Sequence, residues 1–375
     1  MEKHCYELVT GMEERCKTHR LVYDNQTGRL FFFLSLSRKI KQLCKNNTRI
    51  NVIYFNDALI ACFCSFLKLP EQASCMVTLH GLDVIFPSHT YHKYIFNRLN
   101  TYDCLIAVSE ATAKKAKALG VDPQKVVVVP NGVHPVSSVQ DTPDVDFQNW
   151  LSLKQIDLSG RKLLMMMGRP VFRKGFSWFA GNVFPRLQEP FYLVIVGPFH
   201  RMATLLEKFI YLIPKSLRYK VMLFCGYFSD ERQLRKIIGQ SSHIKHLEHL
   251  PYPEVERLFN KVDAFLMPNI PVEGDMEGFG LVCLEASAQG ALVFASAIDG
   301  IPDAIKNERN GFLLPAEDIE AWTDKLNDFA RNTDFYKQYK VPFRQYTLAN
   351  YSWRQMVDAY YQIFERYAKR GNRKD

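Results

Sequence analysis

The hydrophobic residues in the first third of the chain fall into short runs rich in β-branched residues, separated by longer mixed segments. We expect buried strands at residues 19–24, 49–55, 75–81, 103–109 and 125–132. Continuous apolar runs of this kind are typical of parallel sheets that are covered on both faces. Between them the spacing favours helices, one of which has Ser109 as its cap and stops at Gly120. The alternation predicts a doubly wound α/β domain.

This alternation stops after Gly132 and then restarts. Residues 133–146 are rich in Pro, Ser and Asp, as linkers are. A second set of strands is predicted at 162–169, 191–198, 220–227, 264–269, 291–296 and 311–315. The predicted architecture is two doubly wound α/β domains in series. We expect an N-terminal domain over residues 1–135, a C-terminal domain over 136–351, and a last helix at 352–370 that packs back on the first domain.

Composition is that of an ordinary globular protein. Of the 375 residues, 47% are hydrophobic and 23% are charged. The nine cysteines have no paired spacing and no secretory leader pattern opens the chain, so we expect a cytoplasmic protein without disulfides. The longest early apolar run, Ala58 to Leu67, is about half of the roughly twenty residues that a bilayer crossing needs.

The net charge of +9 is unevenly distributed. Between Asp24 and Asp57 there is no acidic residue, and the cations there are Arg29, Arg38, Lys39, Lys41, Lys45 and Arg49. A helix from about Leu30 to Lys45 would place these apolar residues near one another: Leu30, Phe33, Leu34, Ile40 and Leu43. Two interpretations remain for residues 29–49: contact with an anionic membrane surface, or packing on the sheet with a solvated basic edge. Nucleic acid is not an expected partner, because aromatic residues are not interleaved with the basic ones on a suitable element.

The stretch "GRPVFRKG", residues 168–175, follows a predicted strand and leads into a helix. Its cations and glycines suit the binding of a phosphate, since glycine lets the backbone approach an anion closely. It matches neither the Walker order nor the Rossmann glycine pattern. The alternative is a solvated basic loop.

The stretch "MEGFGLVCLEASAQG" places two glutamates around a turn made by Gly278 and Gly280. A helix is predicted from near Gly280 to Gly290, and the free amides at its start can hold a diphosphate. Glu285 in that helix can accept hydrogen bonds from a ribose diol, and Glu277 before the turn can face a sugar ring. The alternative is that both glutamates only stabilise the helix start, by about 0.3–1 kcal/mol each.

No metal site is expected from the sequence. The "DVD" of Asp144 to Asp146 resembles a metal-binding D-x-D pattern, but it lies in the predicted linker. His89 and His92 follow His80 without a further Cys or acidic residue at a spacing that would complete a site.

Four motifs in order resemble glycosyltransferase family 4: "HG" at 80–81, "VPNGV" at 129–133, "GRPVFRKG", and the E-x7-E pattern of "EGFGLVCLE". The resemblance covers almost the whole chain. It implies the GT-B fold, an α/β architecture with two Rossmann-like doubly wound domains facing a central cleft. It also implies retaining, metal-independent transfer without a cofactor. The donor would be a UDP- or GDP-linked sugar, and the acceptor a glycan or lipid-linked hydroxyl in the synthesis of cell-envelope polysaccharide or lipopolysaccharide.

The resemblance also implies roles for individual residues. Arg169 and Lys174 would bind the donor diphosphate, and Glu285 the ribose. Glu277, with the amides of Gly278, Phe279 and Gly280, would hold the transferred sugar and phosphate. His80 would face the reacting sugar from the N-terminal domain, and Asp83 would touch the acceptor. Because many members are attached to the inner face of a membrane by basic helices, the resemblance favours peripheral attachment through residues 29–49.

The chain departs from the family pattern at its start. Members usually begin with a strand followed by a glycine pair, whereas "MEKHCYELVTGM" is typical of the helix after that pair. We therefore expect either that the true start of the protein lies upstream or that the sheet lacks this first strand and glycine loop. Two other functions are compatible with the motifs: a catalytically impaired nucleotide-sugar-binding or scaffolding protein of the same fold, and a GT-B epimerase or phosphorylase.

Overall fold

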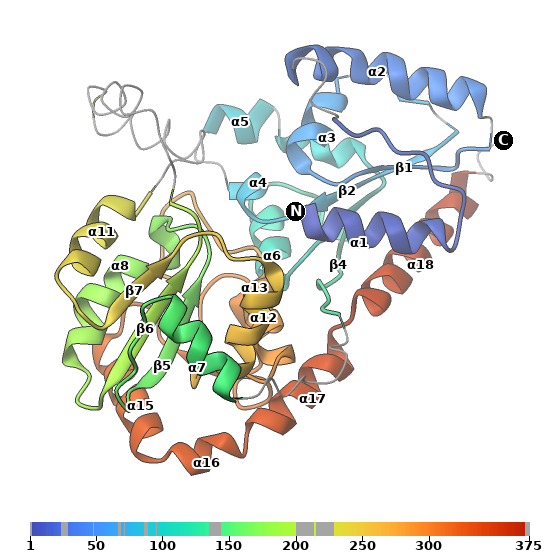
Figure 1. The fold of residues 1–375 in the computed structure, drawn as a ribbon. Coiled ribbons are helices and arrows are strands. Elements are labelled where there is room, and N and C mark those ends of the chain that lie inside the picture. Colours follow the sequence, from blue (N-terminus) through green and yellow to red (C-terminus); the bar gives the residue numbers. More distant parts are fainter. Residues whose placement is uncertain are drawn as a thin grey trace. The chain divides into compact units, whose positions relative to one another are not determined.

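The computed structural model describes the chain except for residues 1, 24–28, 48, 67–68, 71, 86–88, 95, 135–143, 200–213, 215–228 and 372–375. The chain forms two compact units, which Figure 1 shows by sequence colour. Unit 1 comprises residues 1–132 and 352–375, and unit 2 comprises residues 133–351.

The described part of unit 1 contains a parallel sheet in the order β1-β2-β3-β4. Its strands are β1 (Val52–Phe55), β2 (Ser74–Leu79), β3 (Cys104–Ala107) and β4 (Val126–Val128). Its helices are α1 (Glu2–Glu13), α2 (Arg29–Asn46), α3 (Ala58–Cys64), α4 (Leu82–Ile85), α5 (His89–Tyr94), α6 (Glu110–Ala118) and α18 (Trp353–Gly371), with 3₁₀ turns at Phe96–Thr101 and Pro123–Lys125. Ser109 caps α6 by accepting a hydrogen bond from the amide of Thr112, as predicted.

Four of the five strands predicted for this unit are confirmed, with shorter bounds, and one prediction is wrong. Residues 19–23 form no strand, and Asp24 lies outside the described residues. The physical reason is a lack of burial: Leu21 and Val22 are exposed, so the short apolar run has no sheet to pack into.

Helix α2 is confirmed, but its predicted apolar face is partly wrong. The side chains that enter the core are Phe32, Leu36, Ile40 and Cys44, which are spaced by four residues and form one stripe. Leu34, which was expected to share one apolar face with Ile40, is exposed, and Leu43 is half-buried. The predicted contributions of Leu30 and Phe33 lie outside the described side chains.

The first and last helices of unit 1 pack against each other and against the sheet. Arg15 near the end of α1 donates to the carboxylate of Asp358 in α18 at 3.1 Å. Tyr360 in α18 shares a 2.8 Å hydrogen bond with Thr78 of β2. His4 in α1 is almost fully buried beside the Tyr360 ring, and its Nδ1 lies 2.8 Å from Oδ1 of Asn131.

The described part of unit 2 contains a six-stranded parallel sheet in the order β10-β9-β8-β5-β6-β7. Its strands are β5 (Lys162–Met167), β6 (Phe191–Val196), β7 (Ile244–Leu247), β8 (Ala264–Met267), β9 (Leu292–Ser296) and β10 (Phe312–Leu314). Its α-helices are α7 (Asp144–Leu153), α8 (Phe176–Trp178), α11 (Glu231–Gly239), α12 (Tyr252–Lys261), α13 (Leu281–Ala288), α14 (Ile301–Ala304), α15 (Ile319–Arg331), α16 (Thr333–Lys337) and α17 (Lys340–Asn350). A 3₁₀ turn spans Phe172–Lys174, and α8 continues through a π-helical turn (Phe179–Val183) into a 3₁₀ turn (Phe184–Arg186).

Five of the six strands predicted for this unit are confirmed, while the sixth, at 220–227, lies outside the described residues. The prediction missed β7. This strand lies at the edge of the described sheet, where Lys245 and His246 are only half-buried. Its sequence therefore lacks the continuous apolar run that identifies the central strands.

The loop after β5 depends on a glycine. Gly175 has a φ of +64°, in the left-handed region, and an added Cβ would lie 2.0 Å from the carbonyl oxygen of Pro268. The neighbouring backbone bond from the amide of Ile270 to the oxygen of Arg173, 3.0 Å long, ties the same loop to the segment after β8. Among the helices that the structure describes, none is long and apolar enough to cross a bilayer.

We expect Gly175→Ala to destabilise unit 2 more than Gly160→Ala does. Both glycines have a left-handed φ, but a Cβ added at Gly160 would have no atom within 4 Å, so that substitution measures backbone strain alone, about 1–2 kcal/mol. Urea unfolding followed by circular dichroism gives the comparison. Equal shifts of the two midpoints would contradict the close approach to Pro268.

We expect unit 1 to lose stability as the pH falls from 6.5 towards 3, in part because of His4. Burial lowers the pKa of His4 from 6.5 to about 3. In that window the unfolded chain binds a proton that the folded chain does not, so the free energy of unfolding decreases as pH falls. His4→Gln should reduce this slope by about 1.4 kcal/mol per pH unit. Exposed His19, changed to Gln, is the control, and an unchanged slope in the His4 variant would refute the assignment.

Candidate functional site

The cations of "GRPVFRKG" lie on the loop that follows β5. Gly168 still pairs with β6, through its amide to the oxygen of Val196 at 2.9 Å, and the Arg169 side chain is exposed. The 3₁₀ turn over Phe172–Lys174 then buries Lys174 almost completely and leaves Arg173 half-buried. We call residues 168–175 the cation loop.

Asp230 anchors the cation loop from the start of α11. Its amide donates to the oxygen of Pro170 at 2.9 Å, and its carboxylate accepts from both the amide and the hydroxyl of Ser177. Val171 forms an antiparallel bridge with Ser229 beside it. Burial raises the pKa of Asp230 to about 6, although the Ser177 hydrogen bonds oppose the change.

Glu277 joins the cation loop to the predicted E-x7-E motif. Its Oε2 lies 2.8 Å from Nζ of Lys174 and is also paired with the Arg173 guanidinium. Arg173 in turn donates from Nε to Asp275 at 3.0 Å. Two cations and two carboxylates are thus collected in a site where each side chain is at most 17% exposed.

The charge state of Glu277 follows from a competition between burial and these cations. Burial alone would raise its pKa, but Arg173 and Lys174 outweigh burial and lower the pKa to about 2. Glu277 is therefore ionised at neutral pH. With all four groups charged, their formal charges cancel, so these two cations give no excess of positive charge.

The N-terminus of α13 follows Glu277 directly. Gly280 takes a φ of +86° at the N-cap, and the helix start has no side-chain cap. The amide of Cys283 donates to the oxygen of Gly280 at 2.9 Å, while the amides before it precede the first possible i to i−4 bond of the helix. The turn is fixed by hydrogen bonds at Glu277: its amide donates to Asp299 at 3.1 Å, and its oxygen accepts from Gly300 at 2.9 Å. Phe279 is buried, and Glu285 is half-buried in the second turn of α13.

His80 and Asp83 belong to unit 1, at the carboxyl end of β2. The Nε2 of His80 lies 2.9 Å from the backbone oxygen of Asn56, and burial lowers the pKa of His80 to about 4. The Asp83 carboxylate accepts from the amides of His80 at 2.9 Å, Gly81 at 2.8 Å and Ala58 at 3.3 Å. Through these contacts Asp83 fixes the shape of the loop that carries His80.

The structure thus brings together Lys174, Glu277 and the turn of Gly278, Phe279 and Gly280. Arg169 lies on the same loop as Lys174 but points to solvent. Sequence reasoning did not assign roles to Arg173, Asp275 or Asp230, which hold this arrangement. It also missed Asn269 after β8, whose Nδ2 lies 3.5 Å from Glu277 while its buried Oδ1 has no partner among the described residues. Arg173 could have been found, because it lies within "GRPVFRKG". The other three residues belong to no motif that the sequence alone would identify.

The described residues contain no cluster of three or more His, Cys, Asp or Glu that could hold a metal ion. Asp146 is exposed on α7, and His92 places Nε2 3.1 Å from the backbone oxygen of Val84. The side chains of Asp144 and His89 lie outside the described residues.

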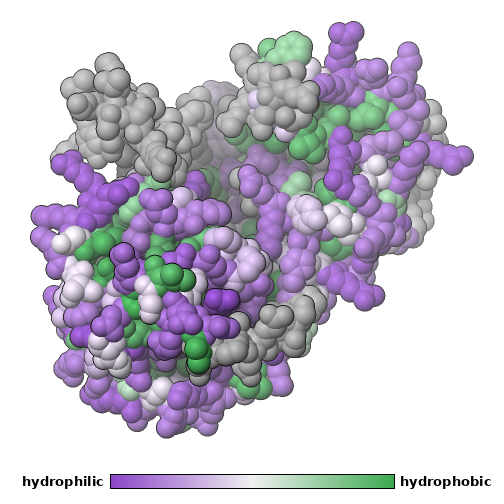
Figure 2. Space-filling model, in the orientation of Figure 1, coloured by the Kyte–Doolittle hydropathy of each residue, from purple (hydrophilic) through white to green (hydrophobic). Residues whose placement is uncertain are grey.

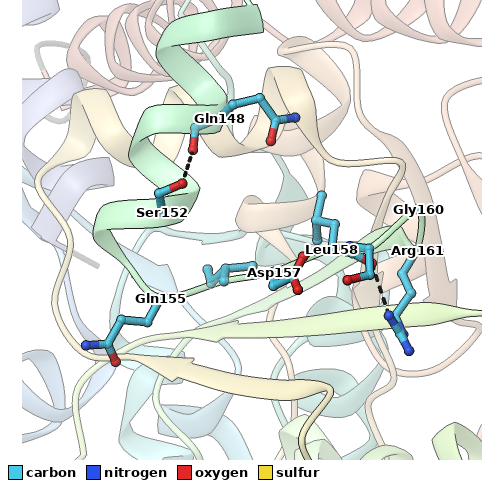
Figure 3. A pocket seen from close by; sticks show the side chains of 9 residues that line it. Gln148, Ser152, Gln155, Asp157, Leu158, Gly160 and Arg161 are labelled. Carbon is cyan, nitrogen blue, oxygen red and sulfur yellow. Dashed lines mark hydrogen bonds between the residues drawn. The ribbon is translucent and has the colours of Figure 1, made fainter.

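A shallow recess elsewhere in unit 2 does not include these residues. It lies between α7 and the start of β5 and is lined by Gln148, Ser152, Gln155, Asp157 and Arg161, among others (Figure 3). Ser152 donates to the oxygen of Gln148 and Arg161 to that of Leu158, so these polar groups are engaged with nearby backbone. The recess brings together no set of charged side chains comparable to that around Glu277.

Comparison with protein families gives two matches that follow the two units. Residues 6–136 match Glycosyltransferase Family 4, and residues 151–342 match Glycosyl transferases group 1. Among curated proteins, the putative colanic acid biosynthesis glycosyltransferase WcaL of Salmonella typhimurium is 32% identical over 120 residues, which is 31% of this chain and 29% of that protein. The amylovoran biosynthesis glycosyltransferase AmsK of Erwinia amylovora is 34% identical over 26% of this chain and 25% of its own length. These matches therefore span less than a third of those relatives.

Solved structures support the same fold over nearly the whole chain. A glycosyltransferase from Rickettsia africae has a TM-score of 0.68 at 18% identity, covering 96% of this chain and 88% of that one. HepE of Anabaena, solved in complex with UDP, has a TM-score of 0.68 at 14% identity, covering 89% of this chain and 82% of its own.

The two parallel-sheet α/β units, the likeness to these solved structures and a group 1 match over more than half of the residues lead to one conclusion. The chain belongs to the group 1 glycosyltransferases and has the GT-B fold, and its N-terminal residues 6–136 match Glycosyltransferase Family 4.

Proposed function

We propose that this enzyme transfers a sugar from a UDP- or GDP-linked donor to a hydroxyl of a glycan or glycolipid, with retention at the anomeric carbon. The observation that carries the proposal is the pairing of Lys174 with Glu277 directly before the uncapped start of α13. Cations, helix amides and a carboxylate are the groups that a sugar diphosphate requires. The names of relatives in colanic acid and amylovoran synthesis support a polysaccharide acceptor, and HepE was solved with UDP. We extend the proposal to lipopolysaccharide on the sequence resemblance alone.

In this proposal Glu277 binds the transferred sugar as a hydrogen-bond acceptor. Each contact that its carboxylate makes with a described side chain uses Oε2: those from Arg173, Lys174 and Asn269. Oε1 is then directed to a sugar hydroxyl. A permanently ionised acceptor also stabilises the positive charge that develops on the sugar as its bond to the diphosphate breaks.

The donor diphosphate is bound by Arg169, Lys174 and the amides of Gly278, Phe279 and Gly280, and Glu285 binds the ribose. Because Glu277 and Asp275 already compensate two cations, the uncompensated attraction for phosphate comes from Arg169 and the α13 amides. Lys174 is shared between Glu277 and the phosphate when the donor binds. These groups supply the charge stabilisation that a divalent metal would otherwise provide, so the proposal requires no metal or cofactor.

His80 has a narrower role in this reaction than proton transfer. A pKa of about 4 keeps the imidazole neutral at physiological pH. With Nε2–H donated to Asn56, the Nδ1 atom can accept a hydrogen bond from a sugar hydroxyl. Asp83 orients His80 in the acceptor-side unit. Residues 29–49 would place the enzyme on the inner face of the cytoplasmic membrane, beside a lipid-linked acceptor.

We expect Lys174→Met and Glu285→Ala each to weaken the binding of UDP or GDP by about tenfold to a hundredfold, since each removes charge-assisted hydrogen bonds. Isothermal titration calorimetry measures this directly. Matched controls are Lys337→Met and Glu320→Ala, which change exposed residues elsewhere in unit 2; like Glu285, Glu320 lies within a helix. Binding by either test variant as tight as its control would reject the donor site. Tight donor binding without transfer would instead favour a nucleotide-sugar-binding or scaffolding protein.

We expect Arg173→Met to lower kcat with little change in the donor KM, because Arg173 positions Glu277 rather than the diphosphate. Loss of the cation also raises the pKa of Glu277, so the acid limb of the pH–rate profile should move to higher pH. Arg173→Lys should restore part of both effects. An acid limb at the wild-type pH in Arg173→Met would show that Arg173 does not control Glu277.

A further inference from the structure

The loop after β9 contains a residue whose backbone conformation is unfavourable for its side chain. Among the described residues other than glycine, five take a left-handed φ. Four of them are exposed: Gln155, Ser159, Glu308 and Glu317. Their side chains are hydrophilic, as is most of the described surface on the face of unit 2 that Figure 2 shows. The fifth, Asp299, has a φ of +53° and is half-buried.

Asp299 and the residue after it hold both backbone polar groups of Glu277. The Asp299 carboxylate accepts a hydrogen bond from the amide of Glu277 at 3.1 Å. The amide of Gly300 donates to the backbone oxygen of Glu277 at 2.9 Å. A Cβ added at Gly300 would lie 2.2 Å from the oxygen of Gly278, so this glycine also packs closely against the turn. We call residues 299–300 the Glu277 clamp.

The left-handed φ of Asp299 has an energetic cost that a glycine at this position would avoid. Side chains are disfavoured in this region, although aspartate tolerates it better than most residues do. Glycine adopts the conformation freely, but it has no carboxylate to accept the hydrogen bond from Glu277. Retained backbone strain is concentrated at functional sites, so the aspartate at this position points to a role beyond packing.

The Glu277 clamp complements the contacts that hold the Glu277 side chain. Arg173 and Lys174, in the loop after β5, fix Oε2 of the carboxylate. The clamp, in the loop after β9, fixes the amide and the oxygen of the same residue. A carboxylate is oriented only when its backbone is also held in place, so the two loops together determine where Oε1 lies.

We propose that Asp299 is a positioning residue for sugar transfer, which fixes the Glu277 carboxylate and the turn of Gly278 to Gly280 through the amide of Glu277. The inference rests on the proposed function of Glu277. Asp299 acts through Glu277 and is not itself placed on the donor. A charged acceptor holds the amide more firmly than a neutral one does. A misplacement of about 1 Å at a reacting centre can lower a rate by about a hundredfold.

The test compares Asp299→Gly with Glu308→Gly. Both residues are acidic and lie between β9 and β10, with φ values of +53° and +57°, but Glu308 is exposed. Both substitutions therefore relieve backbone strain and remove one negative charge, and the first also removes the hydrogen bond to the Glu277 amide. The assay is the release of UDP or GDP from UDP-glucose, UDP-galactose and GDP-mannose.

We expect kcat to fall by about tenfold to a hundredfold in Asp299→Gly and to change by less than about twofold in Glu308→Gly. The fall in kcat should exceed any loss of affinity for UDP or GDP, because Gly300 still holds the turn. Asp299→Asn should recover most of the lost kcat, since asparagine tolerates a left-handed φ and keeps an acceptor oxygen. If Asp299 only stabilised the fold, kcat would instead follow the urea midpoint in all three variants.

Backbone hydrogen exchange tests the Glu277 clamp without a substrate. We expect the amide of Glu277 to exchange faster in Asp299→Gly than in Glu308→Gly. The inference is overturned if the two variants exchange this amide equally, or if Asp299→Gly has the kcat of Glu308→Gly. Either result in an active wild-type enzyme would leave the proposed function intact. If the wild-type protein releases no diphosphate from any of the three donors, the proposed function fails, and the role of Asp299 in transfer fails with it.

Discussion

The arrangement of unit 2 depends on the compensation of Lys174 and Arg173 by Glu277 and Asp275. Each of these groups would be costly to bury alone, and each is stabilised only while its partners stay in place. The requirement explains why the loop after β5 and the turn before α13, about a hundred residues apart in sequence, are held so closely in register. It also means that electrostatic attraction for a diphosphate is not simply the sum of nearby cations. In the proposed donor site, the exposed Arg169 and the helix amides would therefore carry a larger share than the count of basic residues suggests.

Much of the architecture could be predicted from the sequence because parallel strands that are buried on both faces have continuous runs of apolar residues. This held for β2, β3, β5 and β8, whose residues are buried along most of their length. The prediction of strands from apolar runs failed where the hydrophobicity of a segment does not match its burial. The run at 19–23 was apolar enough but remained exposed, and β7 was a strand although its middle residues are polar. Whether a short segment finds a sheet edge is decided by the rest of the fold and not by its own residues.

In the candidate site too, some residues could be predicted from the local sequence and others depend on the rest of the fold. The sequence predicted Lys174, Glu277 and the Gly278–Gly280 turn, because charged residues and glycines that follow a strand or precede a helix are typical of binding sites. The groups that hold them, Asp230, Asp275 and Asn269, come from segments without a recognisable motif, because their contribution exists only once distant strands lie side by side. The basic residues of α2 could be counted from the sequence, but which of its apolar residues remained exposed depended on which stripe entered the core.

The bridge between Val171 and Ser229 and the hydrogen bonds of Asp230 join the start of α11 to the cation loop. Because these contacts lie on both sides of Lys174 in the sequence, a displacement of the helix start would be transmitted to that side chain. The start of α11 should therefore tolerate little evolutionary drift, although it carries none of the residues assigned to the donor.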